Sequence, residues 1–146
     1  MNLEQVADEL SIRRLVDMFC EGVNSRNIDL WASVWDDDSP SFSFGLNNIR
    51  GKDAIVSGFA SGIAGYELLF QIVSNGLIDI NGDSATGQWH LVEISQTRDG
   101  GSGQRLSRCN DAYIRSISGW RLQHRVVEHL YKGDTPLGGW ISPTTD

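Results

Sequence analysis

The spacing of apolar residues changes once along the chain, near Tyr66, and this change restricts the possible folds more than any other feature. Before Tyr66, apolar residues recur every three or four positions, which is typical of amphipathic helices. After it they alternate with polar residues, and turn signals such as Asn81-Gly82-Asp83 separate four extended runs. Helices followed by consecutive antiparallel strands indicate the α+β class.

The first part of the chain predicts three helices and one short strand. The expected elements are a long helix over 3–23, a second helix over 28–35, a strand over 41–44, a turn over 45–51 and a third helix over 52–63. The four extended runs predict strands over 66–80, 84–97, 104–116 and 120–131. Strands of this length twist strongly, so we expect a curved, mainly antiparallel sheet with the N-terminal helices packed on one face.

Length and composition indicate one globular domain. A chain of 146 residues with 40% hydrophobic and 21% charged residues is long enough for one core and too short for two. We expect the domain to cover residues 1–132 and a tail to cover 133–146. No stretch approaches the roughly 18 consecutive apolar residues of a membrane span, and the N-terminus lacks the features of a secretory signal. These observations predict a soluble cytoplasmic protein that does not bind membranes.

Charge and motifs argue against several functional classes. The net charge of −7 and the scattered basic residues oppose nucleic-acid binding. The cysteines, Cys20 and Cys109, have no CxxC spacing, so we expect both to be reduced and buried. The chain has no phosphate loop, dinucleotide fingerprint, nucleophile elbow or set of metal ligands. We therefore expect neither a cofactor nor a metal.

Five segments, in this order and spacing, resemble the SnoaL-like branch of the nuclear transport factor 2-like superfamily. They are Glu21-Gly22-Val23-Asn24-Ser25-Arg26, Trp31-Ala32-Ser33-Val34-Trp35-Asp36-Asp37, Arg50-Gly51-Lys52-Asp53-Ala54-Ile55, Asp79-Ile80-Asn81-Gly82-Asp83-Ser84-Ala85 and Ser118-Gly119-Trp120-Arg121-Leu122. The resemblance implies a cone-shaped α+β barrel around a pocket for a small organic molecule. Relatives include scytalone dehydratase, bile-acid dehydratases and hexachlorocyclohexane dehydrochlorinase.

The resemblance also suggests which residues to consider as catalytic. Catalytic relatives use an aspartate at the end of the first helix to orient a histidine on the first long strand, and that histidine removes a proton from the substrate. The corresponding positions here are Asn24 and Gln71, two neutral amides that cannot exchange protons near pH 7. The dehydrochlorinase also carries an arginine on its last strand that assists the leaving anion, and Arg125 corresponds to it.

Each of these residues also has a structural explanation. Asn24 is an ordinary residue for a helix end. Gln71 lies in an apolar run, so its amide needs a buried partner, which favours a contact inside the pocket. Aromatic residues could form the pocket wall or simply pack the core. The candidates for the wall are Phe19, Trp31, Trp35, Phe70, Trp89 and Tyr113.

Two further residues could act as a base. Glu93 shares a strand face with Trp89 and could accept a proton if burial makes it less acidic, although it could equally pair with an arginine. His129 shares a face with Arg125 and could reach the pocket mouth. By the same alternation, His90 points away from Trp89, and His124 points away from Arg125.

Three functions remain open after these considerations. The first is a cofactor-independent lyase, dehydratase or isomerase acting on a cyclic or aromatic substrate, with Arg125 holding an anionic oxygen or leaving group. The second is a small-molecule-binding protein that has lost the catalytic pair. The third is an interaction domain that uses its curved sheet to form oligomers. In each case we expect a homodimer or homotrimer, assembled through the face of the sheet opposite the helices.

Overall fold

The structure, a computed structural model, describes residues 1–143. Helix α1 (Leu3–Asn24) opens with a capping box, in which Asn2 and Gln5 exchange side-chain and backbone hydrogen bonds. Its buried face includes Ile12 and Phe19. Near its end, Gly22 leaves room for α2 (Ile28–Ser33), because a Cβ atom there would lie only 2.7 Å from the Trp31 Cβ. This close approach places Trp31 directly over α1.

Helix α2 is shorter than the predicted 28–35, and the reason is pairing with the sheet. Trp35 forms a bridge with Leu122, the Leu122 amide donates to the Val34 carbonyl, and the Asp36 amide donates to the Leu122 carbonyl. These backbone bonds replace the next helical turn. Trp35 is fully buried and packs against the rings of Phe19, Trp31 and Phe42.

A hairpin and a helix follow. Strand β1 (Ser41–Phe44) was predicted, but the expected turn over 45–51 contains a strand, β2 (Asn47–Arg50), that pairs antiparallel with β1. Asparagine is uncommon in strands, so this segment resembles a turn in the sequence. Helix α3 (Lys52–Ala64) comes next, as predicted to within one residue.

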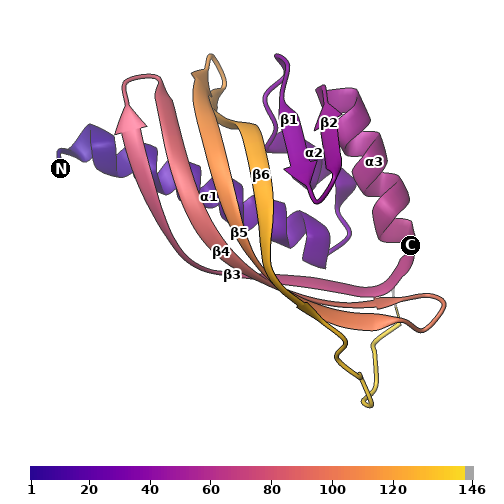
Figure 1. The fold of residues 1–146 in the computed structure, drawn as a ribbon. Helices are drawn as coiled ribbons and strands as arrows, with labels where there is room; N and C mark the ends of the chain where they lie inside the picture. The colour runs from indigo at the N-terminus through magenta and orange to yellow at the C-terminus, as the bar shows by residue number, and fades with distance from the viewer. Residues whose placement is uncertain (144–146) are drawn as a thin grey trace.

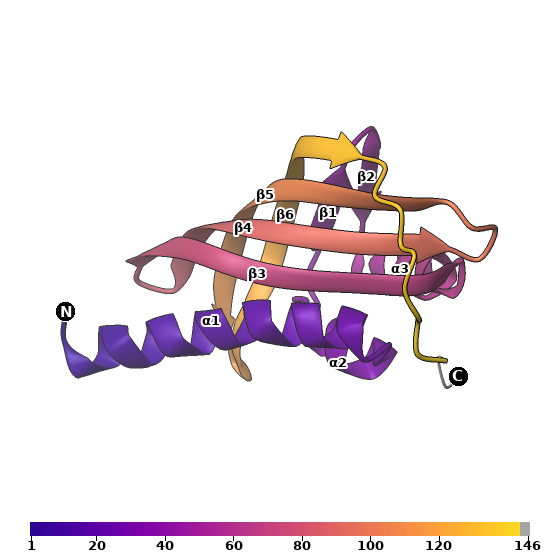
Figure 2. The ribbon, with the colours of Figure 1, turned by 90° about the horizontal axis from the view of Figure 1, so that it is seen from below.

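Four long strands form most of the sheet, as the alternating pattern predicted. They are β3 (Tyr66–Asn81), β4 (Ser84–Thr97), β5 (Ser102–Ser116) and β6 (Gly119–Gly133). The six strands lie in the order β2-β1-β6-β5-β4-β3, and all neighbours are antiparallel except β1 and β6. The sheet curves around the helices, with α1 running along β3 (Figures 1 and 2). The predicted α+β cone is confirmed.

A register shift in β6 decides which side chains reach the concave face. Trp120 and Leu122 are buried, and after a shift opposite Ala112/Tyr113 the inward positions become Arg125, Val127 and His129. Without this shift, alternation would turn His129 outward. After Gly133 the described residues form no helix or strand, and within 1–143 no helix is long and apolar enough to cross a membrane.

Candidate functional site

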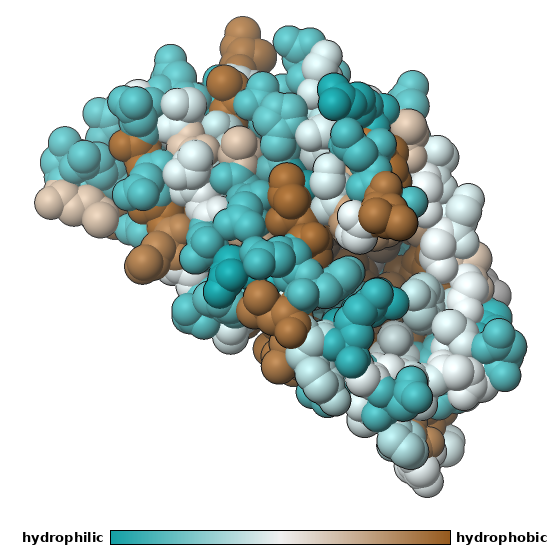
Figure 3. All heavy atoms as spheres, in the orientation of Figure 1, coloured by the Kyte–Doolittle hydropathy of each residue, from teal (hydrophilic) through white to brown (hydrophobic). Residues whose placement is uncertain are grey.

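A cavity of about 230 Å³ lies between the three helices and the concave face of the sheet. In the space-filling view a hollow with apolar atoms along its wall opens between the sheet and α3 (Figure 3). A dry cavity of about 150 Å³ can hold benzene. The volume therefore suits a molecule with one ring and a few substituents.

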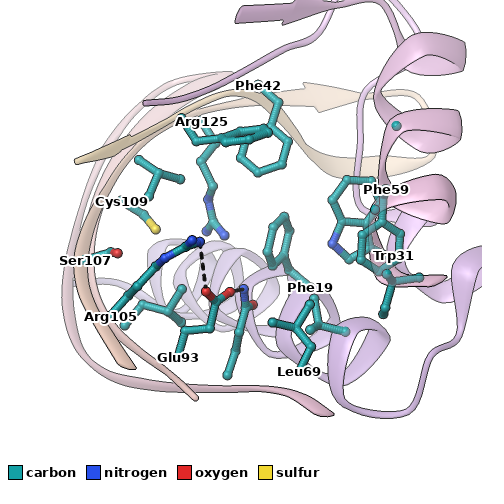
Figure 4. Close-up of a pocket in the computed structure, with 18 of the residues that line it drawn as sticks. Phe19, Trp31, Phe42, Phe59, Leu69, Glu93, Arg105, Ser107, Cys109 and Arg125 are labelled. Carbon is teal, nitrogen blue, oxygen red and sulfur yellow. Dashed lines mark hydrogen bonds and ion pairs between the residues drawn. The ribbon is translucent and has the colours of Figure 1, made fainter. Parts of the chain in front are cut away.

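One wall of the cavity is aromatic. The rings of Trp31 and Phe59 stack with centroids 4.1 Å apart, and Phe19 and Phe42 continue the wall. The indole nitrogen of Trp31 is buried and has no hydrogen-bond partner among the described residues. It faces the open space of the cavity (Figure 4). This N–H group is a donor that a ligand could satisfy.

The opposite wall carries a polar row that crosses three strands. Gln71 of β3, Glu93 of β4 and Arg105 of β5 lie directly opposite one another in register. Gln71 Nε2 donates to one oxygen of Glu93 at 3.1 Å, and an Arg105 Nη donates to the other at 3.3 Å (Figure 4). The carboxylate of Glu93 is only 15% exposed. Gln71 Oε1 is buried and has no hydrogen-bond partner within residues 1–143, so it presents an acceptor to the cavity.

His129 lies beside this row. Its Nδ1 is 3.0 Å from the Ser107 hydroxyl oxygen, and both residues line the cavity. Burial lowers the pKa of His129 below its ordinary value, and the nearby charges of Arg105 and Lys132 lower it further. The lowered pKa favours the neutral imidazole at pH 7. When Nδ1 donates its proton to Ser107, Nε2 carries a lone pair that can accept a proton.

Arg125 lines the cavity, but a carboxylate already neutralises its charge. Its Nε and one Nη donate to Asp111 at 2.8 and 2.7 Å, and its guanidinium lies 4.2 Å from the centre of the Phe19 ring. Burial alone would lower the pKa of Arg125, but Asp111 holds it well above its ordinary value. The described residues provide no partner for the second Nη, which is the part of Arg125 left for a ligand.

Asn24 acts on the backbone rather than in the cavity. Its side-chain oxygen accepts from the Gln71 amide and its side-chain nitrogen donates to the Gln71 carbonyl, both at 2.8 Å. It does not line the cavity. Asn24 therefore contacts the backbone of Gln71, and the two side chains do not form the pair that the resemblance implied.

Four aromatic residues proposed for the wall lie elsewhere. Phe70 is 42% exposed on the convex face, because Leu69 and Gln71 occupy the inward positions on either side of it. Trp35, Trp89 and Tyr113 are buried in the core outside the cavity. Trp89 donates to the Tyr113 hydroxyl, which donates to Asp111. This chain of hydrogen bonds supports the Asp111 carboxylate that holds Arg125.

The sequence analysis missed Arg105, Ser107 and Asp111. All three lie at alternate positions of β5, and the run from 105 to 113 places five odd-numbered side chains on the concave face. Alternation would have grouped them, but their chemistry gave no signal because Arg, Ser and Asp are common on exposed strands. Their partners are 12 to 22 residues away in sequence and come from other strands.

The side chains of the described residues do not suggest a metal site. Among residues 1–143 no three His, Cys, Asp or Glu side chains gather in a way that could hold a metal ion. Cys109 lines the cavity, and burial raises the pKa of its thiol, which keeps it protonated at pH 7. Among the residues that line the cavity, His129 and Glu93 are the candidates for proton transfer.

Comparison with solved structures places the chain among proteins of the same fold. It superposes on a type 2 hexachlorocyclohexane dehydrochlorinase with a TM-score of 0.85 and 18% identity, over 98% of each chain. A type 3 dehydrochlorinase from Novosphingobium barchaimii gives 0.81 and 18%, over 98% of this chain and 100% of the other. A Novosphingobium aromaticivorans protein provisionally named a scytalone dehydratase gives 0.81 and 16%, over 91% of each.

No curated protein matches the chain. The SnoaL-like domain matches residues 4–126, which span all but the end of the last strand of the fold. This match agrees with the resemblance found in the sequence. The chain belongs to the SnoaL-like domain family.

Proposed function

We propose that the protein is a lyase or isomerase that needs no cofactor and acts on a small cyclic or aromatic molecule. The observation that carries the proposal is the pair of His129 and Glu93 at the polar wall of one apolar cavity. A neutral imidazole can take a proton at pH 7, and the charge of Glu93 favours the imidazolium that forms. The dehydrochlorinases and dehydratase of similar fold agree with such chemistry.

In this mechanism the substrate ring lies against Trp31 and Phe59. Nε2 of His129 takes a proton from a ring carbon, and the electrons of that C–H bond form a double bond as the neighbouring C–X bond breaks. A halide leaves as an anion. A hydroxyl group leaves as water, because the imidazolium donates the proton to the hydroxyl oxygen as the C–O bond breaks. The Nη of Arg125 that does not bind Asp111 and the remaining donors of Arg105 can stabilise negative charge on the leaving group.

A binding protein is the second candidate. The Trp31 nitrogen and Gln71 Oε1 are a buried donor and a buried acceptor that find no partner in the described part of the chain. Each costs about 1–3 kcal/mol until a ligand or water pairs with it. The two positions of the family's catalytic pair hold amides. A protein of this kind would bind ring compounds without converting them.

The test compares two histidines with matched surroundings. His129 and His124 each place Nδ1 near a serine hydroxyl, Ser107 and Ser41, but only His129 lines the cavity. Each is changed to Gln, and elimination is followed by the ultraviolet absorbance of products from halogenated and hydroxylated ring compounds. We expect His129→Gln to lower kcat by about 10²- to 10⁴-fold and His124→Gln to leave it unchanged.

The pH profile gives a second measure. Because burial lowers the pKa of His129, kcat/KM should fall on the acid side with a midpoint below about 6.5. That limb should vanish in His129→Gln. Equal activity in both histidine variants would exclude His129 as the base. Tight binding without turnover of any compound would favour the binding protein.

A further inference from the structure

A second hollow adjoins the cavity at the open ends of the long strands. It measures about 350 Å³ and is lined mostly by polar residues and glycines, with Ser95, Thr97 and Gln104 among them. Tyr66 and Arg105 line both the inner cavity and this outer groove, so the two spaces meet at these side chains. A ligand that filled the inner cavity could extend past Arg105 into the groove.

The polar row of the inner wall continues into the groove. Lys132 of β6 lies directly opposite Arg105 in register, so the row runs from Gln71 through Glu93 and Arg105 to Lys132. Two cations directly opposite each other on neighbouring strands repel and destabilise a sheet. Arg105 has one ionic partner, Glu93, on its inner side, and among residues 1–143 Lys132 has no carboxylate within 4.0 Å.

An anion between these two cations would relieve the repulsion. Long-range attraction cannot explain anion binding here, because the net charge is −7 and the general field repels anions. Binding would therefore depend on local hydrogen bonds from Arg105 and Lys132. Asp134 also lines the groove and would weaken such binding.

We propose that the inner cavity and the outer groove form one site for a ring compound with a carboxylate on a short chain. The ring occupies the aromatic cavity, and Arg105 and Lys132 bind the carboxylate. The proposal rests on the proposed function only in placing the ring in the inner cavity. The carboxylate is a separate group from the leaving group near Arg125, and it lies at Arg105 and Lys132 in the groove.

Titration calorimetry with matched acids and alcohols tests the proposal. The acids are benzoate, phenylacetate, phenylpropionate and phenylbutyrate, and each is compared with the alcohol of the same length. We expect at least one acid to bind about threefold to tenfold more tightly than its alcohol, as hydrogen bonds to charged groups allow. The advantage should shrink as salt is added.

The two lysines of the chain provide a matched control. Lys132→Gln and Lys52→Gln change the net charge equally, but Lys52 pairs with Asp37 away from both hollows. The advantage of the acid should disappear in Lys132→Gln, persist in Lys52→Gln and increase in Asp134→Asn. If the alcohols bind and no acid binds more tightly, or if Lys132→Gln changes nothing, the carboxylate site is refuted while the inner cavity stands. If neither the acids nor the alcohols bind, the proposal that the inner cavity holds a ring is refuted as well.

Discussion

Among single residues, Asn24 has a structural role that an aspartate at the same position would lose in part. Its amide uses both a donor and an acceptor on the Gln71 backbone, in the manner of a neighbouring strand. An aspartate would keep the acceptor, lose the donor and place a charge against the Gln71 carbonyl. We expect Asn24→Asp to lower the free energy of unfolding by about 1–3 kcal/mol, measured by urea denaturation at pH 7.

Asn75 provides the control for this change. Asn75 lies on β3, the strand of Gln71, and is exposed. Among the described residues only its side-chain oxygen forms a hydrogen bond, as an acceptor from Ser74. Asn75→Asp should change the free energy of unfolding by less than about 0.5 kcal/mol. Equal stability of Asn24→Asp and Asn75→Asp would contradict the view that the Asn24 side chain stabilises the packing of α1 on β3 through its two hydrogen bonds to Gln71.

Among the elements, β3 and β4 are joined by one close contact, between the backbone of Gly76 and the ring of Trp89. Gly76 follows a register shift in β3, and a Cβ atom there would lie 2.1 Å from the Trp89 ring. The indole therefore rests on the bare backbone of β3, and its nitrogen reaches Tyr113. We expect Gly76→Ala to reduce the free energy of unfolding by about 1–3 kcal/mol, because Trp89 or the strand must shift.

A second glycine should respond in the opposite direction. Gly62 lies within α3 and has open space around its Cβ position. Gly62→Ala should raise the free energy of unfolding by about 0.5–1 kcal/mol, since alanine favours a helix interior. Both changes can be followed by urea denaturation. If Gly76→Ala causes no loss of stability while Gly62→Ala does, the close contact between Gly76 and Trp89 does not stabilise the fold as described.

At the scale of the whole molecule, the convex face of the sheet carries exposed apolar side chains. Phe70, Ile72, Leu106 and Val126 come from three strands and are 39–50% exposed. Such a face is typical of an interaction surface. We propose that it joins copies of the chain into a homodimer or homotrimer, and that sedimentation at micromolar concentration detects a species heavier than 16.1 kDa. Ile72→Lys should shift the sedimentation profile toward the monomer, because it places a charge on the proposed interface.

Leu46→Lys serves as the control for the oligomer. Leu46 is fully exposed in the turn between β1 and β2, away from the convex face of the long strands. The same charge added there should leave the sedimentation profile unchanged. A monomer in the unmodified protein at this concentration would argue against assembly through the sheet.

The sequence predicted elements well where a repeating pattern was long. The four strands and the three helices follow from local spacing, and the α+β class is confirmed. Prediction failed where distant backbone decided the local structure. The α2 helix ends early because Trp35 pairs with Leu122, and Asn47–Arg50 becomes a strand because β1 lies beside it.

The α+β class, the order of every element except β2 and the apolar face of most strands follow from the spacing of residues along the chain. The resemblance of five segments indicated the family, whereas the chemistry of the site depends on contacts that form only in the folded molecule. The tertiary structure joined Arg125 to Asp111, turned His129 inward through a register shift and aligned Gln71, Glu93, Arg105 and Lys132 across four strands. These contacts depend on the register between strands, which no local pattern in the chain specifies.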